Sequence, residues 1–392
     1  MSTLFRRQLV SLALVAPLLL FLIVFFAVPL FTMMKSAVSD PVATSALPAS
    51  SIALSDWDRS SPLTPEVRAA FVEDLRQISD DQLFGDLVRR LNSAKSGFRT
   101  LMTKTRTAVN DTAGPIDLTA VDKRWADNSY WQVIAIATSS AITDRNLLAA
   151  VDLERNASGR IEAIPAGASA NRTILVRTFS MSLAVTAACI LIGFPFAMIA
   201  ASVEGWRRQL LLGAVLLPLW TSLLVRTAAW FILLQDTGLI NSTLMFLGLT
   251  TQPIALIFNR VGVVIAMTHV LLPFMVLPIF SVLVGIPKTL MPAAASLGAH
   301  PVRAFFAVLL PLALRGVISG SLLVFMSALG YYITPALIGG AKDQMISSVI
   351  AYYATGAANW GMAGALGLVL LTATLLLYAV YLKLSAEREL KP

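Results

Sequence analysis

Long uncharged apolar runs, separated by short charged segments, make up most of this chain. The first run occupies 8–34, and the chain from 173 onwards holds several more of similar length. A bilayer core of about 30 Å is crossed by roughly 20 apolar residues in a helix. The runs therefore predict membrane-spanning helices. The later runs lie at 178–203, 209–225 with a continuation past Arg226 to Leu234, 261–287, 316–341 and 344–382.

The first and last runs need interpretation. The last, 344–382, is too long for one helix, and Gly356, Asn359 and Gly361 favour a loop followed by a span from about 361. The first run resembles a secretory signal because two arginines precede it. Its apolar stretch is too long for an ordinary signal, and no small-x-small cleavage site follows promptly, so we expect an uncleaved helix. The pattern predicts an all-α membrane protein with six transmembrane helices.

Residues 35–172 alternate charges with short apolar stretches and hold no run that could span a membrane. Thr64-Pro65-Glu66 is typical of a helix start, and Asp80-Asp81 predicts a second one. We interpret 39–55 as an extended linker and 144–154 as a further helix. The whole is expected to be a large, mostly helical extracytoplasmic insert between helices 1 and 2, with Trp125 and Trp131 in its core. Docking of an external partner, a cap over a pore and a solvated insertion all remain open.

Composition agrees with a membrane protein. Of the 392 residues, 57% are hydrophobic and 13% charged, whereas soluble domains carry about 25% charged residues. The mean hydropathy is +0.75. These values exclude a disordered chain and a conventional soluble enzyme. One cysteine, Cys189, and two histidines, His269 and His300, exclude a disulfide framework and a Cys- or His-rich metal site, so no metal ligands are predicted.

The net charge of +8 is unevenly distributed. Residues 35–172 hold 16 basic and 17 acidic residues, so the excess belongs to the apolar part of the chain. Basic residues at the ends of spans are a topology signal rather than a nucleic-acid patch. With both termini in the cytoplasm, ten of the fourteen basic residues outside the insert lie on that side. The insert then lies outside, and 204–208, 286–315 and the tail 384–392 are cytoplasmic.

The cytoplasmic segment 287–317 has an unusual pattern. Ala293–Ala295 is strongly helix-forming, Gly298 then ends the turn or lets another surface approach, and His300-Pro301 turns the chain. A second, amphipathic stretch leads into the next span. Two short helices around a glycine break would form a stiff lever, which suits a docking site for a soluble motor. From the residues alone, a passive connector at the membrane interface is as good an interpretation as a docking site.

The segment resembles the EAA loop of ABC importer permeases, whose pattern is E-A-A, three residues, G, nine residues, I-x-L-P. In that family the loop forms the coupling helix, which sits in a cleft of the ATPase subunit. Pro292 stands where the family usually has the acid, which removes a charge that could pair with the ATPase. The residues that fall on the pattern without a gap are Ala293, Ala294, Gly298, Val308, Leu310 and Pro311.

The resemblance extends over most of 9–34 and 173–383, and within it the chain is similar to the spermidine/putrescine permease branch. It implies a type I permease of the bacterial inner membrane. Its parts would be 1–34 with helix 1, the insert 35–172, a five-helix core 173–383 with the coupling loop at 287–312, and the tail 384–392. The segments that carry the branch resemblance are 217–234 (LPLWTSLLVRTAAWFILL), 236–244 (DTGLINSTL), 271–283 (LLPFMVLPIFSVL) and 333–350 (ITPALIGGAKDQMISSVI).

The resemblance implies that transport and ATP hydrolysis are divided between separate chains. The chain would form half of the path for a small solute delivered by a periplasmic binding protein, a polyamine or a related organic compound. An amino-acid derivative, a phosphonate or a metal ion is the alternative cargo. The implied partners are a second permease, expected to be a different chain, two ATPase subunits that bind ATP and Mg, and membrane lipid. No cofactor in this chain and no nucleic acid are implied.

Polar positions within spans mark transport paths. Arg226 is the most unusual, because a charge in the membrane is costly; it could snorkel to the surface or pair with Asp236. A polyamine would need carboxylates and aromatic faces, yet the spans are almost free of acids. Asp236 and Asp343 are the two candidate carboxylates for binding it outside the insert. Aromatic residues at span ends also form interfacial belts. The path candidates are Trp220, Arg226, Trp230, Asp236, Tyr331 and Tyr332.

Other functional classes fit less well. A secondary transporter would show inverted repeats and intramembrane acids, and neither is seen. A receptor would need a cytoplasmic signalling domain, and a membrane enzyme a nucleophile with its base. The chain lacks the Gly-x4-Gly-Lys-Ser/Thr phosphate loop, so we expect it to be a transport subunit whose ATP is hydrolysed in a partner chain.

Overall fold

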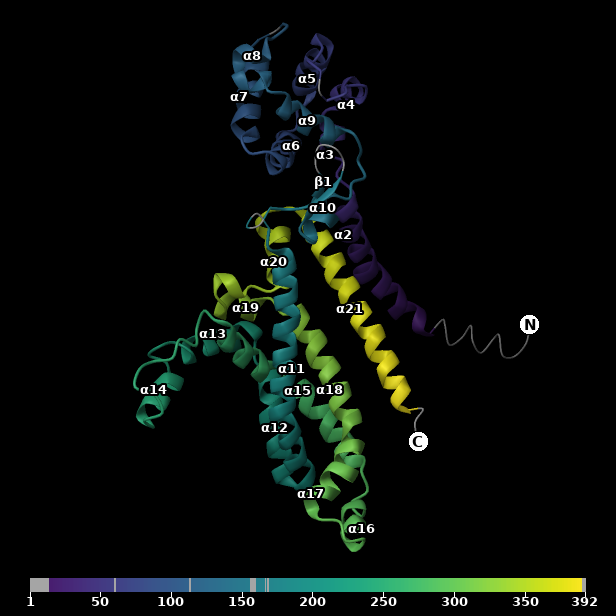
Figure 1. Ribbon diagram of the computed structural model, residues 1–392, viewed down its shortest axis with the longest axis vertical. Helices are drawn as coiled ribbons and strands as arrows, with labels where there is room; N and C mark the ends of the chain where they lie inside the picture. Colours follow the sequence, from purple (N-terminus) through teal and green to yellow (C-terminus); the bar gives the residue numbers. More distant parts are fainter. Residues whose placement is uncertain are drawn as a thin grey trace, which may run out of the picture. The chain divides into compact units, whose positions relative to one another are not determined.

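The structure of the chain is a computed structural model with two compact units, 1–148 and 149–392 (Figure 1). Both are helical, and the all-α class predicted from the sequence is confirmed. The two arginines expected at the cytoplasmic N-terminus and the last residues of the expected tail lie outside the described residues. The structure describes 14–59, 61–112, 114–155, 160–165, 167 and 169–389.

An apolar helix, Leu14–Val38, opens the first unit, and none of its most apolar stretch is buried. It includes a π-helical turn, η1 (Ile23–Ala27), and α2 (Val28–Val38). The remaining helices of this unit are α3 (Val42–Ala46), α4 (Pro48–Ser55), α5 (Pro65–Gln77), α6 (Asp81–Ala94), α7 (Phe98–Asp111), α8 (Leu118–Val121), η2 (Lys123–Ala126) and α9 (Asn128–Thr138).

Helices α3 and α4 occupy the segment interpreted from the sequence as an extended linker, and that prediction is wrong. The N-cap of α4, Leu47, has no side-chain acceptor. Asp74 of α5 takes its place, accepting hydrogen bonds from Ala49 N (3.0 Å), Ser50 N (2.7 Å) and Ser50 Oγ (2.5 Å). A cap supplied from 24 residues away leaves no signal in the local sequence. The starts at Thr64 and Asp80 are confirmed as the N-caps of α5 and α6.

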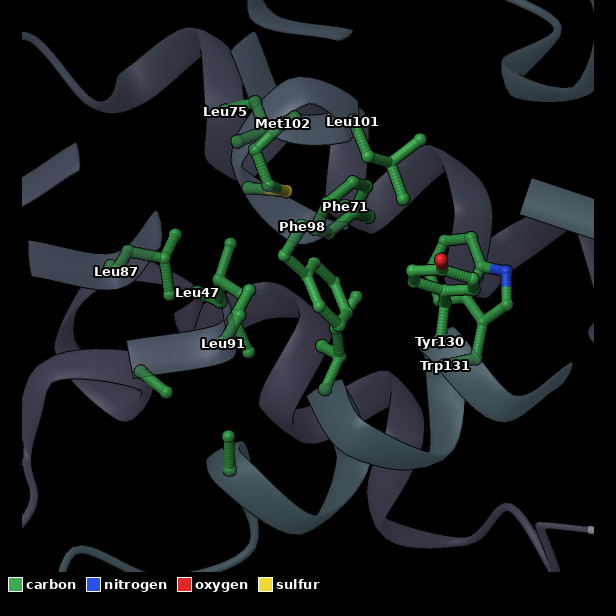
Figure 2. Close-up of a cluster of buried hydrophobic side chains, with 14 of the residues drawn as sticks. Leu47, Phe71, Leu75, Leu87, Leu91, Phe98, Leu101, Met102, Tyr130 and Trp131 are labelled. Atoms are coloured by element: carbon green, nitrogen blue, oxygen red, sulfur yellow. The ribbon is translucent and has the colours of Figure 1, made fainter. Parts of the chain in front are cut away.

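An aromatic cluster forms the centre of this helical domain. Trp125 and Trp131 are 1% and 0% exposed, as predicted, and their ring centroids lie 4.9 Å apart. Phe71 packs against both rings. Trp125 Nε1 donates to Thr105 Oγ1 (2.9 Å), which satisfies its buried N–H. Figure 2 shows Phe71, Trp131 and Phe98 among the leucines of the same core. The domain therefore has a hydrophobic core of its own.

The two ends of the domain lie side by side. Asp40 N donates to Ala141 O (2.8 Å), and Thr143 N donates to Val38 O (2.9 Å). Asp40 also forms an ion pair with Arg90. Paired ends and a separate core are what an inserted domain needs in order to fold without the rest of the chain.

We therefore expect residues 39–143, produced alone, to be soluble and to unfold cooperatively in urea, followed by circular dichroism. Asp74→Ala should lower the free energy of unfolding by about 2–3 kcal/mol, because it removes a buried cap with three hydrogen bonds. Glu73→Ala, at an exposed neighbour on the same helix, should change it by less than about 0.5 kcal/mol. Equal effects of the two substitutions would contradict the capping role.

At the division between the units, the helix predicted at 144–154 is shorter than expected. It ends at Ala150 as α10 (Arg145–Ala150), and the chain continues as strand β1 (Leu153–Arg155), paired antiparallel with β2 (Ile161–Ala163). This hairpin, expected within the insert, groups with the second unit.

The second unit contains the remaining helices. They are α11 (Asn171–Ser202), α12 (Trp206–Trp220), α13 (Leu223–Leu233), α14 (Leu239–Phe246), α15 (Arg260–Gly285), α16 (Leu290–Ser296), α17 (Pro301–Ala304), η3 (Phe305–Leu309), α18 (Leu310–Gly330), α19 (Ile333–Ile338), η4 (Ala341–Asp343), α20 (Ile346–Ala351), η5 (Tyr352–Gly356) and α21 (Trp360–Glu389).

Within the described residues, five helices are long and apolar enough to cross a membrane, and a bent pair raises the number to six. The bent pair is α12 and α13, which meet at 101°. The span predicted over 209–234 is therefore broken into two helices, because Thr221 and Ser222 leave the helical conformation (φ −97°, ψ 150° and φ −58°, ψ 141°) and end α12. The predicted start of the last span near 361 is confirmed by α21.

Helices α11, α15 and α18 pack side by side as the core of the second unit (Figure 1). Glycines allow the closest approach. A Cβ at Gly316 would lie 2.8 Å from Ile279 Cα, and one at Gly320 would lie 3.0 Å from Met275 O. The two glycines are four residues apart, so they form one small-residue face of α18 against the backbone of α15.

Candidate functional site

The EAA-like loop is built around a glycine-terminated helix. Ala299 N donates to Ala294 O (3.0 Å) and Gly298 N donates to Ala295 O (2.9 Å), so α16 ends in a Schellman motif. Gly298 has a φ of +81°, the left-handed conformation that this motif needs at its first residue beyond the cap. The expectation that Gly298 ends the turn is confirmed.

The second half of the loop differs from the expectation. His300 caps α17, accepting a hydrogen bond from Val302 N at Nδ1 (3.4 Å). Helix α17 then continues through the π turn η3 into α18, so Pro301–Gly330 is one apolar helix instead of a short helix at the foot of a span. Pro311 lacks an N–H and would crowd the preceding turn of an α-helix; the wider π turn before it gives the ring room.

The loop presents apolar surface. Leu297 is 89% exposed, and Val302 and Phe306 are also exposed. Ala293 is exposed and Ala294 half-buried. Several exposed apolar side chains in one loop are consistent with an interaction surface.

An ion pair joins two loops at this end of the unit. Lys288, just before α16, pairs with Glu204 in the turn between α11 and α12. The hydrogen bond from Lys288, together with the charges of Lys288 and Arg208, lowers the pKa of the Glu204 carboxyl below its ordinary value. While Glu204 is ionised, this exposed ion pair links the turn to the loop before α16, with a small contribution to stability.

Three of the residues predicted for the path, together with His269, lie in the region where α13 meets α15. Trp230 Nε1 donates to His269 Nδ1 (3.1 Å), and their rings meet edge to face. Arg226 lies one helical turn before Trp230 on α13, and Trp230 and Tyr331 pack against the same buried cluster. His269 is thus hydrogen-bonded, as a packing residue would be. The structure brings Arg226, Trp230 and Tyr331 together among the predicted path residues.

The other path candidates are exposed. Trp220 is 79% exposed at the end of α12, and Tyr332 and Asp236 are exposed. Between the described residues Arg226 and Asp236 there is no ion pair, so that possible pairing is wrong for this structure.

Several polar links in this unit are not visible in the sequence. Asp343 is not a free carboxylate: it pairs with Arg260 Nε at 2.9 Å, across 83 positions of the chain. The hydroxyl groups of Thr227 and Thr334 lie 3.3 Å apart and connect α13 to α19. Within the described part of the chain, no three His, Cys, Asp or Glu side chains are grouped to hold a metal ion.

Comparison with known proteins gives consistent matches for the second unit. Residues 193–387 match the family model described as the binding-protein-dependent transport system inner membrane component. The spermidine/putrescine transport system permease protein PotB of Haemophilus influenzae is 37% identical over 210 residues, 53% of this chain and 73% of that protein. PotB of Escherichia coli is 34% identical over 212 residues, 54% and 77% of the two chains. The E. coli inner membrane ABC transporter permease protein YdcU is 34% identical over 227 residues, 54% and 70% of the two chains.

Proposed function

Because this chain belongs to the family of binding-protein-dependent transport system inner membrane components, we propose that it forms half of the path of an ABC importer for a polyamine or a related small organic solute. The observation that carries the proposal is the similarity to two spermidine/putrescine permeases over about three quarters of their length. An amino-acid derivative, a phosphonate or a metal ion is the alternative cargo.

The proposed assembly contains a second permease, expected to be a different chain, two ATPase subunits that bind ATP and Mg, and a periplasmic binding protein. Two features support it. The sequence has no phosphate-binding loop motif. The spanning helices bury at most 56% of their most apolar stretch inside this chain, which leaves surface for lipid and for a partner.

In this assembly the EAA-like loop docks in a cleft of the ATPase. The docking residues would be those of α16 and the turn after it, while η3 and the start of α18 pass the movement to the span. The glycine-ended helix and the exposed apolar side chains support this role. The proposed coupling residues are Ala293, Ala294, Gly298, Val308, Leu310 and Pro311.

Purification tests the assembly. The tagged chain, expressed with the transporter genes beside its own, should recover a second permease and an ATPase. In vesicles with the ATPase facing inward, the complex should take up labelled spermidine or putrescine. Uptake should require ATP inside the vesicle and binding protein outside. A chain that hydrolyses ATP or transports solute alone would contradict the proposal, and uptake of another solute would change only the cargo.

The proposed topology places both termini in the cytoplasm and the insert outside, and thiol labelling tests it. Ser96 in the insert and Ser296 in α16 are both exposed. In a Cys189→Ala background, an impermeant thiol reagent added to spheroplasts should label the Ser96→Cys variant and spare Ser296→Cys until the membrane is opened. The reverse order of labelling would overturn the topology.

A further inference from the structure

Arg226 belongs to a helix that packs against the middle of α15. The Trp230–His269 hydrogen bond holds α13 against α15. His269 is nine residues after Arg260, the first residue of α15, which places it about 14 Å along the helix. Arg226 and Trp230 are four residues apart and share one face of α13. The guanidinium therefore lies near the part of α15 around His269, away from either end of a helix that is long and apolar enough to cross a membrane.

The guanidinium has no acceptor for its buried N–H groups. Nε and Nη1 of Arg226 are buried and have no hydrogen-bond partner among the described residues. The described helices α11, α12, α13, α15 and α18 contain no Asp or Glu. The acids nearest in the fold are engaged or exposed: Asp343 pairs with Arg260, and Asp236 is exposed and unpaired with Arg226.

An unpaired cation at this depth needs compensation. A guanidinium stays charged at any physiological pH, so it cannot become neutral as a buried lysine can. A charged group without a partner in an apolar medium is costly. A carboxylate is the best partner, because its two oxygens match the guanidinium fork. The described residues supply none to Nε or Nη1, so a second molecule is the source to consider.

The transported solute is a poor source of that carboxylate. The relatives are named for spermidine and putrescine transport, and a polyamine would be repelled by Arg226. The surface next to Arg226 is apolar: Leu224 and Val225 are 58% and 62% exposed, so a helix of a partner protein that packed on them would cover the charge as well.

We propose that a carboxylate side chain of the second permease pairs with Arg226 and fixes the two halves of the path to each other at this depth. The pair also removes a positive charge from the route of a cationic solute. The inference rests on the proposed function, since it requires a second permease.

Recovery of the second permease with the tagged chain tests the pair. Arg226→Met should reduce recovery roughly tenfold or more, because truncation leaves the partner's carboxylate unpaired. Arg226→Lys should keep part of it. The control is Arg172→Met, an exposed cation at the start of α11 with no salt-bridge partner in the described structure, and it should recover the second permease normally.

Charge exchange identifies the partner. Arg226→Glu should abolish recovery, and Arg introduced at one intramembrane acid of the second permease, each tried in turn, should restore both recovery and uptake. If the Arg226→Met variant does not accumulate, the charge exchange by itself tests the ion pair. Normal recovery with Arg226→Met, with or without uptake, would overturn the inference, as would the absence of any restoring combination. Failure of the unaltered chain to recover a second permease would instead contradict the proposed function.

Discussion

Gly298→Val is expected to leave the protein in the membrane at its normal level while reducing ATPase recovery and solute uptake by roughly one to two orders of magnitude. Gly298 has a φ of +81°, and a β-branched residue in this conformation costs about 1–3 kcal/mol. A Cβ there meets nothing within 4 Å of its own chain. The strain therefore comes from the backbone, and any further cost comes from the ATPase surface, where overpacking costs a similar amount.

Two matched substitutions separate these causes. Asparagine tolerates the left-handed conformation, so Gly298→Asn should keep most activity if the backbone is decisive and lose it if the ATPase lies against the glycine. Gly285, at the end of α15, also has open space around a Cβ but no positive φ, so Gly285→Val should remain active. Uptake and ATPase recovery are measured together, and full activity of Gly298→Val would remove the coupling role from the loop.

Gly316→Val is expected to prevent stable folding of the second unit. The new Cβ would lie 2.8 Å from Ile279 Cα and 2.9 Å from Pro278 O. Both are backbone atoms, so no side-chain rotation relieves the contact and α18 must move away from α15. Overpacking of this kind costs about 3 kcal/mol or more, and we expect a large loss of monodisperse protein in detergent after mild heating.

Gly330→Val is the matched control for Gly316→Val. Gly330 ends the same helix, and nothing lies within 4 Å of a Cβ there, so the variant should elute as the unaltered protein does. Size-exclusion chromatography after a temperature series compares the two. Equal stability would show that α15 and α18 are not packed as closely as the structure has them.

The sequence determined the features that depend on neighbouring residues. A long apolar run in a membrane must satisfy its own backbone hydrogen bonds, so it forms a helix whatever it packs against. The start of α21 could therefore be predicted from the sequence. The helix starts at Thr64 and Asp80 and the turn at Gly298 follow from local chemistry as well, because each involves residues within one or two turns.

Tertiary structure alone decided the features that join distant residues. Asp74 caps α4 from 24 residues away, and Asp343 meets Arg260 across 83. Gly316 and Gly320 became contact residues only when α18 met α15. After the bend between α12 and α13, Trp230 meets His269, and Arg226, one turn earlier, has two buried N–H groups without a partner among the described residues. Each outcome depends on which helices become neighbours, and hydrophobicity, which is nearly uniform along these spans, does not specify that choice.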